Sequence, residues 1–129
     1  MDINLPHIHA EVSAAFARYE AALIVNDTET LDELFWDSPN TIRYGQSENL
    51  YGIDEIRSFR TARPNTDLVR ELAQTVITTF GTHTATASTL FRRRGSGRTG
   101  RQMQTWIKTG TTWHVVAAHV SFLDFDWPG

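Results

Sequence analysis

The sequence has 129 residues, of which 40% are hydrophobic and 11% aromatic, and its mean hydropathy is -0.34. These values are typical of a single compact domain over residues 1–129, and they exclude a disordered or collagen-like chain. The absence of cysteine excludes zinc-finger, iron–sulfur, thiol-nucleophile and disulfide sites, and a net charge of -3 disfavours nucleic-acid binding.

The first half of the chain predicts three helices. Apolar residues that recur every three or four positions predict a helix over residues 5–25. Asn26 and Glu29 have the spacing of a capping box, which predicts the start of a second, short helix. A third helix begins at Gly52 and ends before Pro64, because proline interrupts helical hydrogen bonding.

The second half is rich in β-branched residues and is divided by glycine turns, which predicts antiparallel strands. The expected long strands are residues 68–80, 82–94, 101–109 and 113–123. One short strand is expected earlier, over residues 41–44. Amphipathic helices bury their apolar sides by stacking on one face of a sheet. The expected fold class is therefore α+β, a cone-shaped barrel of a curved antiparallel sheet with three N-terminal helices enclosing a blind pocket.

Alternation along the strands assigns residues to the two faces of the sheet. We place His119 and Ser121 on the concave face with Gln102, Gln104 and Trp106, since otherwise large indole rings would lie outside. The residues left on the opposite face are Met103, Ile107, Val116, Ala118 and Val120. This face is apolar, so we expect a homodimer that pairs two sheets.

Several familiar chemistries lack support in the sequence. The histidines show no spacing typical of a metal site, and no serine nucleophile motif is present. Gly95, Gly97 and Gly100 match the letters of a dinucleotide fingerprint, but they join two strands and therefore predict a hairpin loop. The arginines around this loop either bind an anion or an acidic partner, or form a solvated hairpin tip. These arginines are Arg92, Arg93, Arg94, Arg98 and Arg101.

Polar side chains from separate elements surround the predicted pocket. They are Tyr19, Arg43, Arg60, Arg63 and His119. Fixed positive charges, a weak acid and an imidazole make a plausible site for a small carboxylate. Simpler interpretations stay open: Tyr19 as a core aromatic, Arg43 as a strand charge paired with Glu48, and His119 as a core histidine.

Nothing in the sequence indicates a membrane segment. No run of 18 apolar residues occurs, and the first ten residues lack a basic stretch followed by an apolar one. We therefore expect a cytoplasmic protein with neither membrane nor nucleic-acid partners.

Several stretches together are characteristic of one family. They are Phe16–Glu20, Leu31–Trp36, Arg43–Gly45 with Glu48–Gly52, Phe59–Arg60 with Arg63–Pro64, Gly100–Gln102 with Gln104–Trp106, and Trp113 with Ala117–Ser121. In combination they resemble the AtzH-like proteins, a branch of the SnoaL-like, nuclear-transport-factor-two-like superfamily. The resemblance covers nearly the whole chain. It implies a cone with a blind pocket and dimers formed through the sheets.

The resemblance also implies a small, anionic, urea-like substrate. One group of such proteins is associated with oxalurate breakdown. Another decarboxylates 1,3-dicarboxyurea to allophanate in cyanuric acid (s-triazine) catabolism, beside amidohydrolases. We therefore expect a cofactor-independent decarboxylase with neither cofactor nor metal. The alternative is a non-catalytic binding or accessory protein for an oxalurate-like ligand, acting next to an amidohydrolase.

Residue roles follow from the same resemblance. In the decarboxylating group a tyrosine on the first helix and an arginine on the early strand are associated with activity, and Tyr19 and Arg43 occupy the matching positions. We expect the remaining site residues to bind substrate. These are Trp36, Arg60, Arg63, Gln104, His119 and Ser121.

Overall fold

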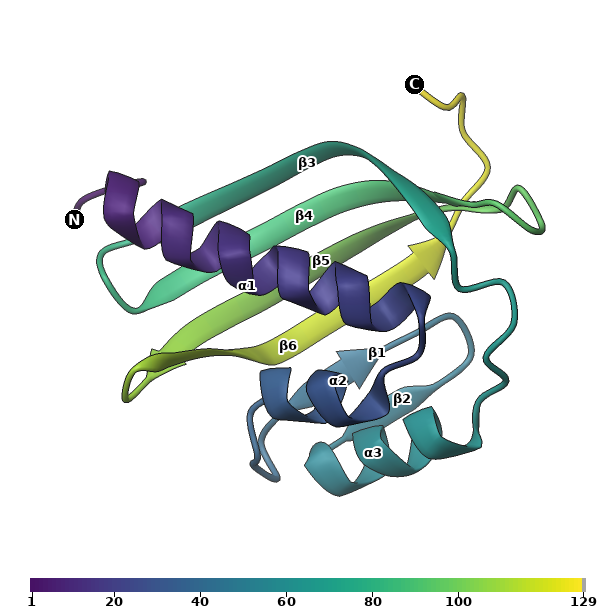
Figure 1. Cartoon of the computed structure of the whole chain (residues 1–129), viewed down its shortest axis with the longest axis horizontal. Helices are drawn as coiled ribbons and strands as arrows, with labels where there is room; N and C mark the ends of the chain where they lie inside the picture. Colours follow the sequence, from purple (N-terminus) through teal and green to yellow (C-terminus); the bar gives the residue numbers. More distant parts are fainter. Residues whose placement is uncertain (129) are drawn as a thin grey trace.

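The computed structural model describes residues 1–128 as a curved sheet with helices packed against its concave side (Figure 1). The helices are α1 (Pro6–Ile24), α2 (Thr28–Leu34) and α3 (Ile53–Ala62). The strands are β1 (Ile42–Tyr44), β2 (Asn49–Tyr51), β3 (Arg70–Phe80), β4 (Thr84–Arg93), β5 (Thr99–Thr109) and β6 (Thr112–Phe122). The predicted α+β class is confirmed, and β2 is a strand that the sequence analysis missed.

The sheet has six strands in the order β2-β1-β6-β5-β4-β3 and is not closed on itself. Neighbouring strands are antiparallel except β1 and β6, which run parallel. The β1–β2 hairpin therefore extends the long meander at the edge formed by β6. This brings the early part of the chain next to the last strand.

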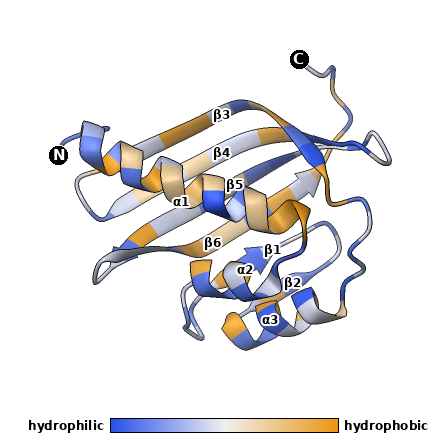
Figure 2. Ribbon diagram, viewed as in Figure 1, coloured by the Kyte–Doolittle hydropathy of each residue, from blue (hydrophilic) through white to orange (hydrophobic). Residues whose placement is uncertain are grey.

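Helix α1 forms where the apolar periodicity predicts it. Pro6 occupies the first turn, where a missing N–H costs nothing, and Val12 and Phe16 are buried against the sheet. Apolar and polar colours alternate along α1, as expected for a helix with one buried side (Figure 2). Within residues 1–128, none of the helices combines the length and apolarity that crossing a membrane requires.

The turn between α1 and α2 differs from the expected capping box. Asp27 caps α2, since its carboxylate accepts the Thr30 N–H at 3.2 Å and the Thr30 hydroxyl at 2.6 Å. Asn26 instead adopts a left-handed backbone conformation, with φ of 53°. Asparagine tolerates this conformation better than most residues. Its side chain is thereby directed to Arg63 of the α3 C-terminus.

A β-bulge in β6 reverses the expected faces of its second half. Trp106 pairs with Val115, but Thr105 pairs with Ala117, so Val116 is an extra residue in β6. Beyond the bulge, Met103 pairs with His119. Each residue after Val116 therefore lies on the face opposite to the one that unbroken alternation predicts.

The face assignment of β6 is consequently wrong from Ala117 onward. His119 and Ser121 lie on the convex face, and they do not share the concave face with Gln104. Ala118 and Val120 lie on the concave face, although they were expected outside. Periodicity could not reveal the bulge, because Val115 to Ala118 are all apolar and fit either face.

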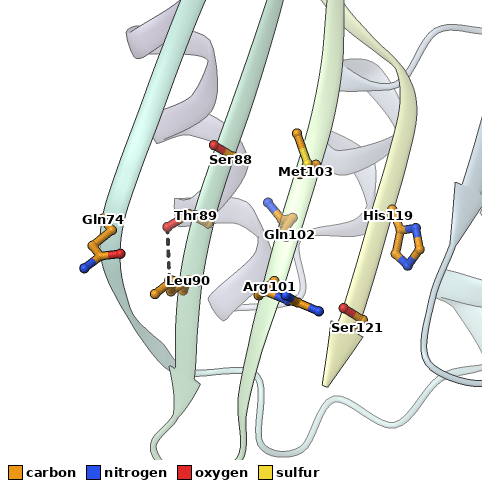
Figure 3. A pocket seen from close by; sticks show the side chains of 9 residues that line it. All are labelled: Gln74, Ser88, Thr89, Leu90, Arg101, Gln102, Met103, His119 and Ser121. Atoms are coloured by element: carbon orange, nitrogen blue, oxygen red, sulfur yellow. Dashed lines mark hydrogen bonds between the residues drawn. The ribbon is translucent and has the colours of Figure 1, made fainter. Parts of the chain in front are cut away.

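The convex face is more polar than expected. It carries a hollow of about 390 Å³ between the central strands, seen in Figure 3 with helices behind the sheet. The hollow is lined by Gln74, Ser88, Thr89, Leu90, Arg101, Gln102, Met103, His119 and Ser121. Met103 is 58% exposed and Val76 is 55% exposed. These two side chains form the apolar part of the surface on which the expected homodimer depends.

We expect two copies to associate through this convex face, and Met103→Glu tests the expectation. In a symmetric dimer this variant would bury two carboxylates at the interface, which costs far more free energy than leaving them exposed in the monomers. The variant should therefore shift the dimer to monomer at micromolar concentration. Sedimentation velocity measures the shift, with Val25→Glu on another surface as control. A wild-type monomer, or a dimer unaffected by Met103→Glu, would contradict this prediction.

Candidate functional site

A cleft of about 310 Å³ opens between the β1–β2 turn, the end of α3, and the ends of β4 and β6. Three arginines line it: Arg43, Arg63 and Arg93. Apolar side chains complete its wall: Phe59, Leu68, Val120 and Phe122. We take this cleft as the candidate site because positive charges from three separate elements converge there. The hollow on the convex face shows no comparable convergence.

Arg43 lies on β1 and already has an acidic partner. Its Nη1 donates to Glu48 Oε1 at 2.9 Å, and both side chains are mostly buried. The guanidinium also lies 5.3 Å from the centre of the Phe59 ring. The pairing with Glu48 that the sequence left open is therefore present.

The Glu48 carboxylate is held by the turn that carries it. The Ser47 N–H and hydroxyl donate to Glu48 Oε2 at 3.2 and 3.3 Å. A Cβ on Gly45 would collide with this carboxylate. Glycine at position 45 therefore allows Glu48 to fold back onto Arg43.

Arg60 and Arg63 lie close together along α3, but their environments differ. Arg60 is 3% exposed, donates to Asp32 Oδ1 at 2.8 Å, and lies 4.2 Å over the Phe35 ring. Burial lowers the pKa of Arg60, while Tyr19 and Asp32 oppose this shift. Asp32 and Phe35 thus already bind the Arg60 guanidinium within the protein.

Arg63 has no carboxylate partner among residues 1–128. Its Nη2 donates to Asn26 Oδ1 at 3.3 Å, and its buried Nε lacks any partner within the same range. Burial, reinforced by Arg43, lowers the pKa of Arg63 to about 10. The guanidinium therefore remains charged at neutral pH and retains unused donors.

Arg93 was not among the expected site residues, although the sequence left open that the arginines around the hairpin loop bind an anion or form a solvated tip. Arg93 stacks 4.7 Å from the Phe122 ring, and burial lowers its pKa. No ion pair within residues 1–128 involves it, and Asp67 in the same cleft instead accepts the Ser96 N–H at 3.1 Å. Alternation with buried Phe91, two residues earlier, was the signal that could have placed Arg93 inside.

A second missed arginine, Arg70 on β3, lies deeper. It forms an ion pair with Glu20 of α1, donates to Gln102 Oε1 at 2.9 Å, and lies 4.7 Å over the Phe91 ring. These contacts fasten α1 to the sheet behind the cleft. Since its donors are committed to protein groups, we regard Arg70 as a positioning residue.

Tyr19 is 5% exposed on the inner side of α1, with its ring centre 6.3 Å from that of Phe35. Its electrostatic interaction with Arg60 and Arg63 opposes the lowering of their pKa by burial. No hydrogen bond within residues 1–128 uses the Tyr19 hydroxyl. The hydroxyl therefore keeps a free donor, although Tyr19 does not line the cleft.

The remaining expected site residues divide into two groups. Gln104 lies on the concave face, in one row of the sheet with Ala118 and Arg43. Gln104 does not line the cleft, however, and neither do Trp36, His119 and Ser121. Tyr19 and Arg60 are also absent from its lining. Trp36 follows the Phe35 bridge to β6 and bonds the Val115 carbonyl through its backbone at 2.9 Å.

The chemistry of this site is that of an anion receptor. Within residues 1–128, no group of three histidine, aspartate or glutamate side chains is placed to hold a metal ion. Three arginines and two acidic residues, Glu48 and Asp67, line the cleft, so its net charge is positive. The arginines fit a small ligand that carries carboxylate or carbonyl oxygens.

Comparisons with known proteins agree with this fold. A family model described as AtzH-like matches residues 1–126, which confirms the resemblance noted in the sequence. A solved structure of a protein of unknown function from Pectobacterium atrosepticum, assigned to the DUF3225 family, is 57% identical with a TM-score of 0.92 over 95% of this chain and 96% of that chain. A cystatin-like fold protein from Burkholderia xenovorans is 44% identical, with a TM-score of 0.93 over 98% and 99%.

More distant similarity indicates the broader superfamily. A nuclear transport factor 2-like superfamily protein from Salmonella enterica is 25% identical, with a TM-score of 0.70 over 95% of this chain and 96% of that chain. None of the curated proteins matches the sequence.

The contrast between Arg60 and Arg63 leads to a paired prediction. Arg60→Met leaves Asp32 unpaired and should cost about 3 kcal/mol of stability, lowering Tm by roughly 10 °C. Arg63→Met removes a charge that burial opposes, so Tm should hold or rise, while affinity for a small dicarboxylate such as glutarate should fall at least about tenfold. Thermal melts and titration calorimetry measure both effects. An equal loss of Tm in the two variants would contradict the assignment.

Proposed function

The chain belongs to the AtzH-like family, and on this premise we propose that it is a cofactor-independent decarboxylase of a small N-carboxylated urea in ureide or s-triazine catabolism. The observation that carries the proposal is the convergence of Arg43, Arg63 and Arg93 on one small cleft. Two of these arginines form no ion pair within residues 1–128. Such a cleft favours a compact ligand with several anionic oxygens.

The proposed reaction converts 1,3-dicarboxyurea and one proton into allophanate and carbon dioxide. The proton joins the nitrogen that carries the departing carboxylate. The bond between this nitrogen and the carboxylate carbon then breaks, and its electron pair stays on nitrogen. No electron is transferred between molecules, so the protein needs to hold the substrate, deliver one proton and exclude water.

The two walls of the cleft suit different ends of such a substrate. An arginine that bound the departing carboxylate would stabilise the ground state, since the charge of that group disappears as carbon dioxide forms. Arg43, Arg63 and Arg93 therefore act best on the carboxylate that remains in the product. The departing carboxylate then lies against the apolar wall of Phe59 and Val120.

Tyr19 is the proposed proton donor or relay. Its hydroxyl has no hydrogen-bond partner within residues 1–128, and it lies near the guanidinium groups of Arg60 and Arg63. In the proposal, these guanidinium groups stabilise the negative charge that develops in the transition state as the proton is transferred. The proton lost to the substrate nitrogen returns from solvent through the open side of the cleft.

A second candidate function is binding without catalysis, for an oxalurate-like ligand beside an amidohydrolase. Two observations favour it: Glu48 already occupies Arg43, and Tyr19 does not line the open part of the cleft. A site of this kind could hold a ligand and leave it unchanged. The fold itself does not discriminate, because one fold hosts many functions.

Direct assay separates the two candidates. Because 1,3-dicarboxyurea is labile, it is generated in situ by an amidohydrolase, and release of carbon dioxide or allophanate is followed with and without the protein. We expect the protein to accelerate release, and we expect dialysis against a strong chelator to leave the rate unchanged. Release at the uncatalysed rate would overturn the decarboxylase and favour the binding protein.

Two conservative substitutions test the residue roles. Tyr19→Phe keeps the ring but removes the hydroxyl, so kcat should fall by roughly 10²–10⁴-fold with little change in ligand affinity. Arg43→Lys keeps the charge but loses the two-pronged donor geometry, so KM should rise and kcat should fall. The matched controls are Tyr51→Phe, at an exposed position, and Arg57→Lys, at a partly exposed position outside the cleft. Unchanged kinetics in Tyr19→Phe would exclude the proton-donor role.

A further inference from the structure

Two glutamines lie side by side on the concave face of β5, almost completely buried. Gln102 is 2% exposed and Gln104 is 1% exposed. The Gln102 Oε1 accepts from Arg70 Nη2 at 2.9 Å, and the Gln104 Oε1 accepts from Trp106 Nε1 at 3.1 Å. In each amide the oxygen is satisfied by a neighbouring side chain.

The chemistry of these neighbours determines which way each amide faces. Guanidinium and indole nitrogens donate hydrogen bonds and cannot accept them. Rotating either amide by 180° would oppose N–H to N–H, so both oxygens must face Arg70 and Trp106. Glu20 holds Arg70 in place through its own ion pair. Both amide NH₂ groups are therefore directed away from these partners.

Neither NH₂ group has an acceptor within residues 1–128. A buried donor without an acceptor costs about 1–3 kcal/mol, and native interiors contain few of them. Here two occur on consecutive inward-facing positions of one strand. Such a pair indicates a site for an acceptor that comes from outside the chain.

Neither glutamine lines the arginine cleft itself, but the sheet register places their strand positions beside strands that do. Gln104 pairs with Ala118, which pairs with Arg43. Two inter-strand spacings, about 10 Å, thus separate the Gln104 and Arg43 backbones, with only a methyl side chain between them. On its other side Gln104 pairs with Ala87, so small residues flank the amide on both neighbouring strands. Gln102 pairs with Val120, which lines the cleft.

We propose that Gln102 and Gln104 form a second, donor-only subsite that binds the carbonyl or carboxylate oxygens at the inner end of a ligand. The anionic outer end of this ligand lies on Arg43 and Arg63. The choice of a small anionic ligand rests on the proposed function. The glutamine subsite narrows this class of ligand further. A ligand needs acceptor oxygens at both ends, so a dicarboxylate or a ureido carboxylate is bound and a simple monocarboxylate is discriminated against.

The test uses two unreactive probes with the same chain of five carbons: glutarate, with a carboxylate at each end, and pentanoate, with one. Titration calorimetry on the wild-type protein should give at least about tenfold tighter binding of glutarate. The single variants Gln104→Met and Gln102→Met each remove one amide donor. In each variant the ratio of glutarate affinity to pentanoate affinity should fall toward one. Gln74→Met, on the convex face, is the matched control and should retain it.

A double variant controls for the destabilisation that Gln104→Met alone would cause. Gln104→Met leaves the Trp106 indole N–H without its acceptor, which by itself destabilises the core. The double variant Gln104→Met with Trp106→Phe removes both groups, so it should fold and still lose the glutarate preference. Circular dichroism verifies the fold before each titration.

The outcomes distinguish this inference from the proposed activity. A glutarate preference that disappears in the glutamine variants supports the subsite, even where 1,3-dicarboxyurea is not decarboxylated. Equal affinity of the wild-type protein for both probes, or an unchanged preference in the variants, means that buried water alone satisfies the amides. Either result overturns the subsite, and neither affects the decarboxylation assay.

Discussion

Repulsion among buried guanidinium groups is the constraint around which this interior is organised. Five arginines enter the space between the sheet and the helices: Arg43, Arg60, Arg63, Arg70 and Arg93. Each pair of like charges is costly in a medium that screens less than water. Three of the five are neutralised by Glu48, Asp32 and Glu20. Net positive charge remains at the cleft, where an anion can enter.

The elements of the fold are arranged to supply this compensation. Glu20 comes from α1, Asp32 from α2 and Glu48 from the β1–β2 turn, so three separate elements are tied to the sheet or to α3 by ion pairs with arginine. Four of the five arginines also stack on a phenylalanine ring, and Arg63 is the exception. Arginine side chains therefore serve both stability and anion binding. An arginine paired with a carboxylate of the protein stabilises the fold, whereas an arginine without such a partner is available to bind an anion.

Local patterns in the sequence were sufficient for most of the fold and for part of the site. The three helices and four long strands follow from periodicity and glycine turns, and Arg43 and Arg63 reach the cleft as expected. Two kinds of feature were beyond such patterns. The bulge at Val116 lies in an apolar run that fits either face, so His119 was assigned to the wrong side. The Glu20–Arg70 pair joins residues 50 positions apart, and only the folded sheet brings them together.

The arrangement of donors along the cone gives the cavity a direction. Arginines and apolar side chains line the cleft, and in the proposed subsite the buried amides of Gln102 and Gln104 form the inner end. Neutral amide donors bind a carbonyl or carboxylate oxygen less strongly than a guanidinium does, because they add no net charge. An anion that enters therefore keeps its most strongly bound carboxylate near the mouth, while its other end meets neutral donors and apolar walls. A carboxylate at the inner end is stabilised less by the protein than one bound to the arginines. The free-energy cost of losing its charge during the reaction is therefore lowest at the inner end.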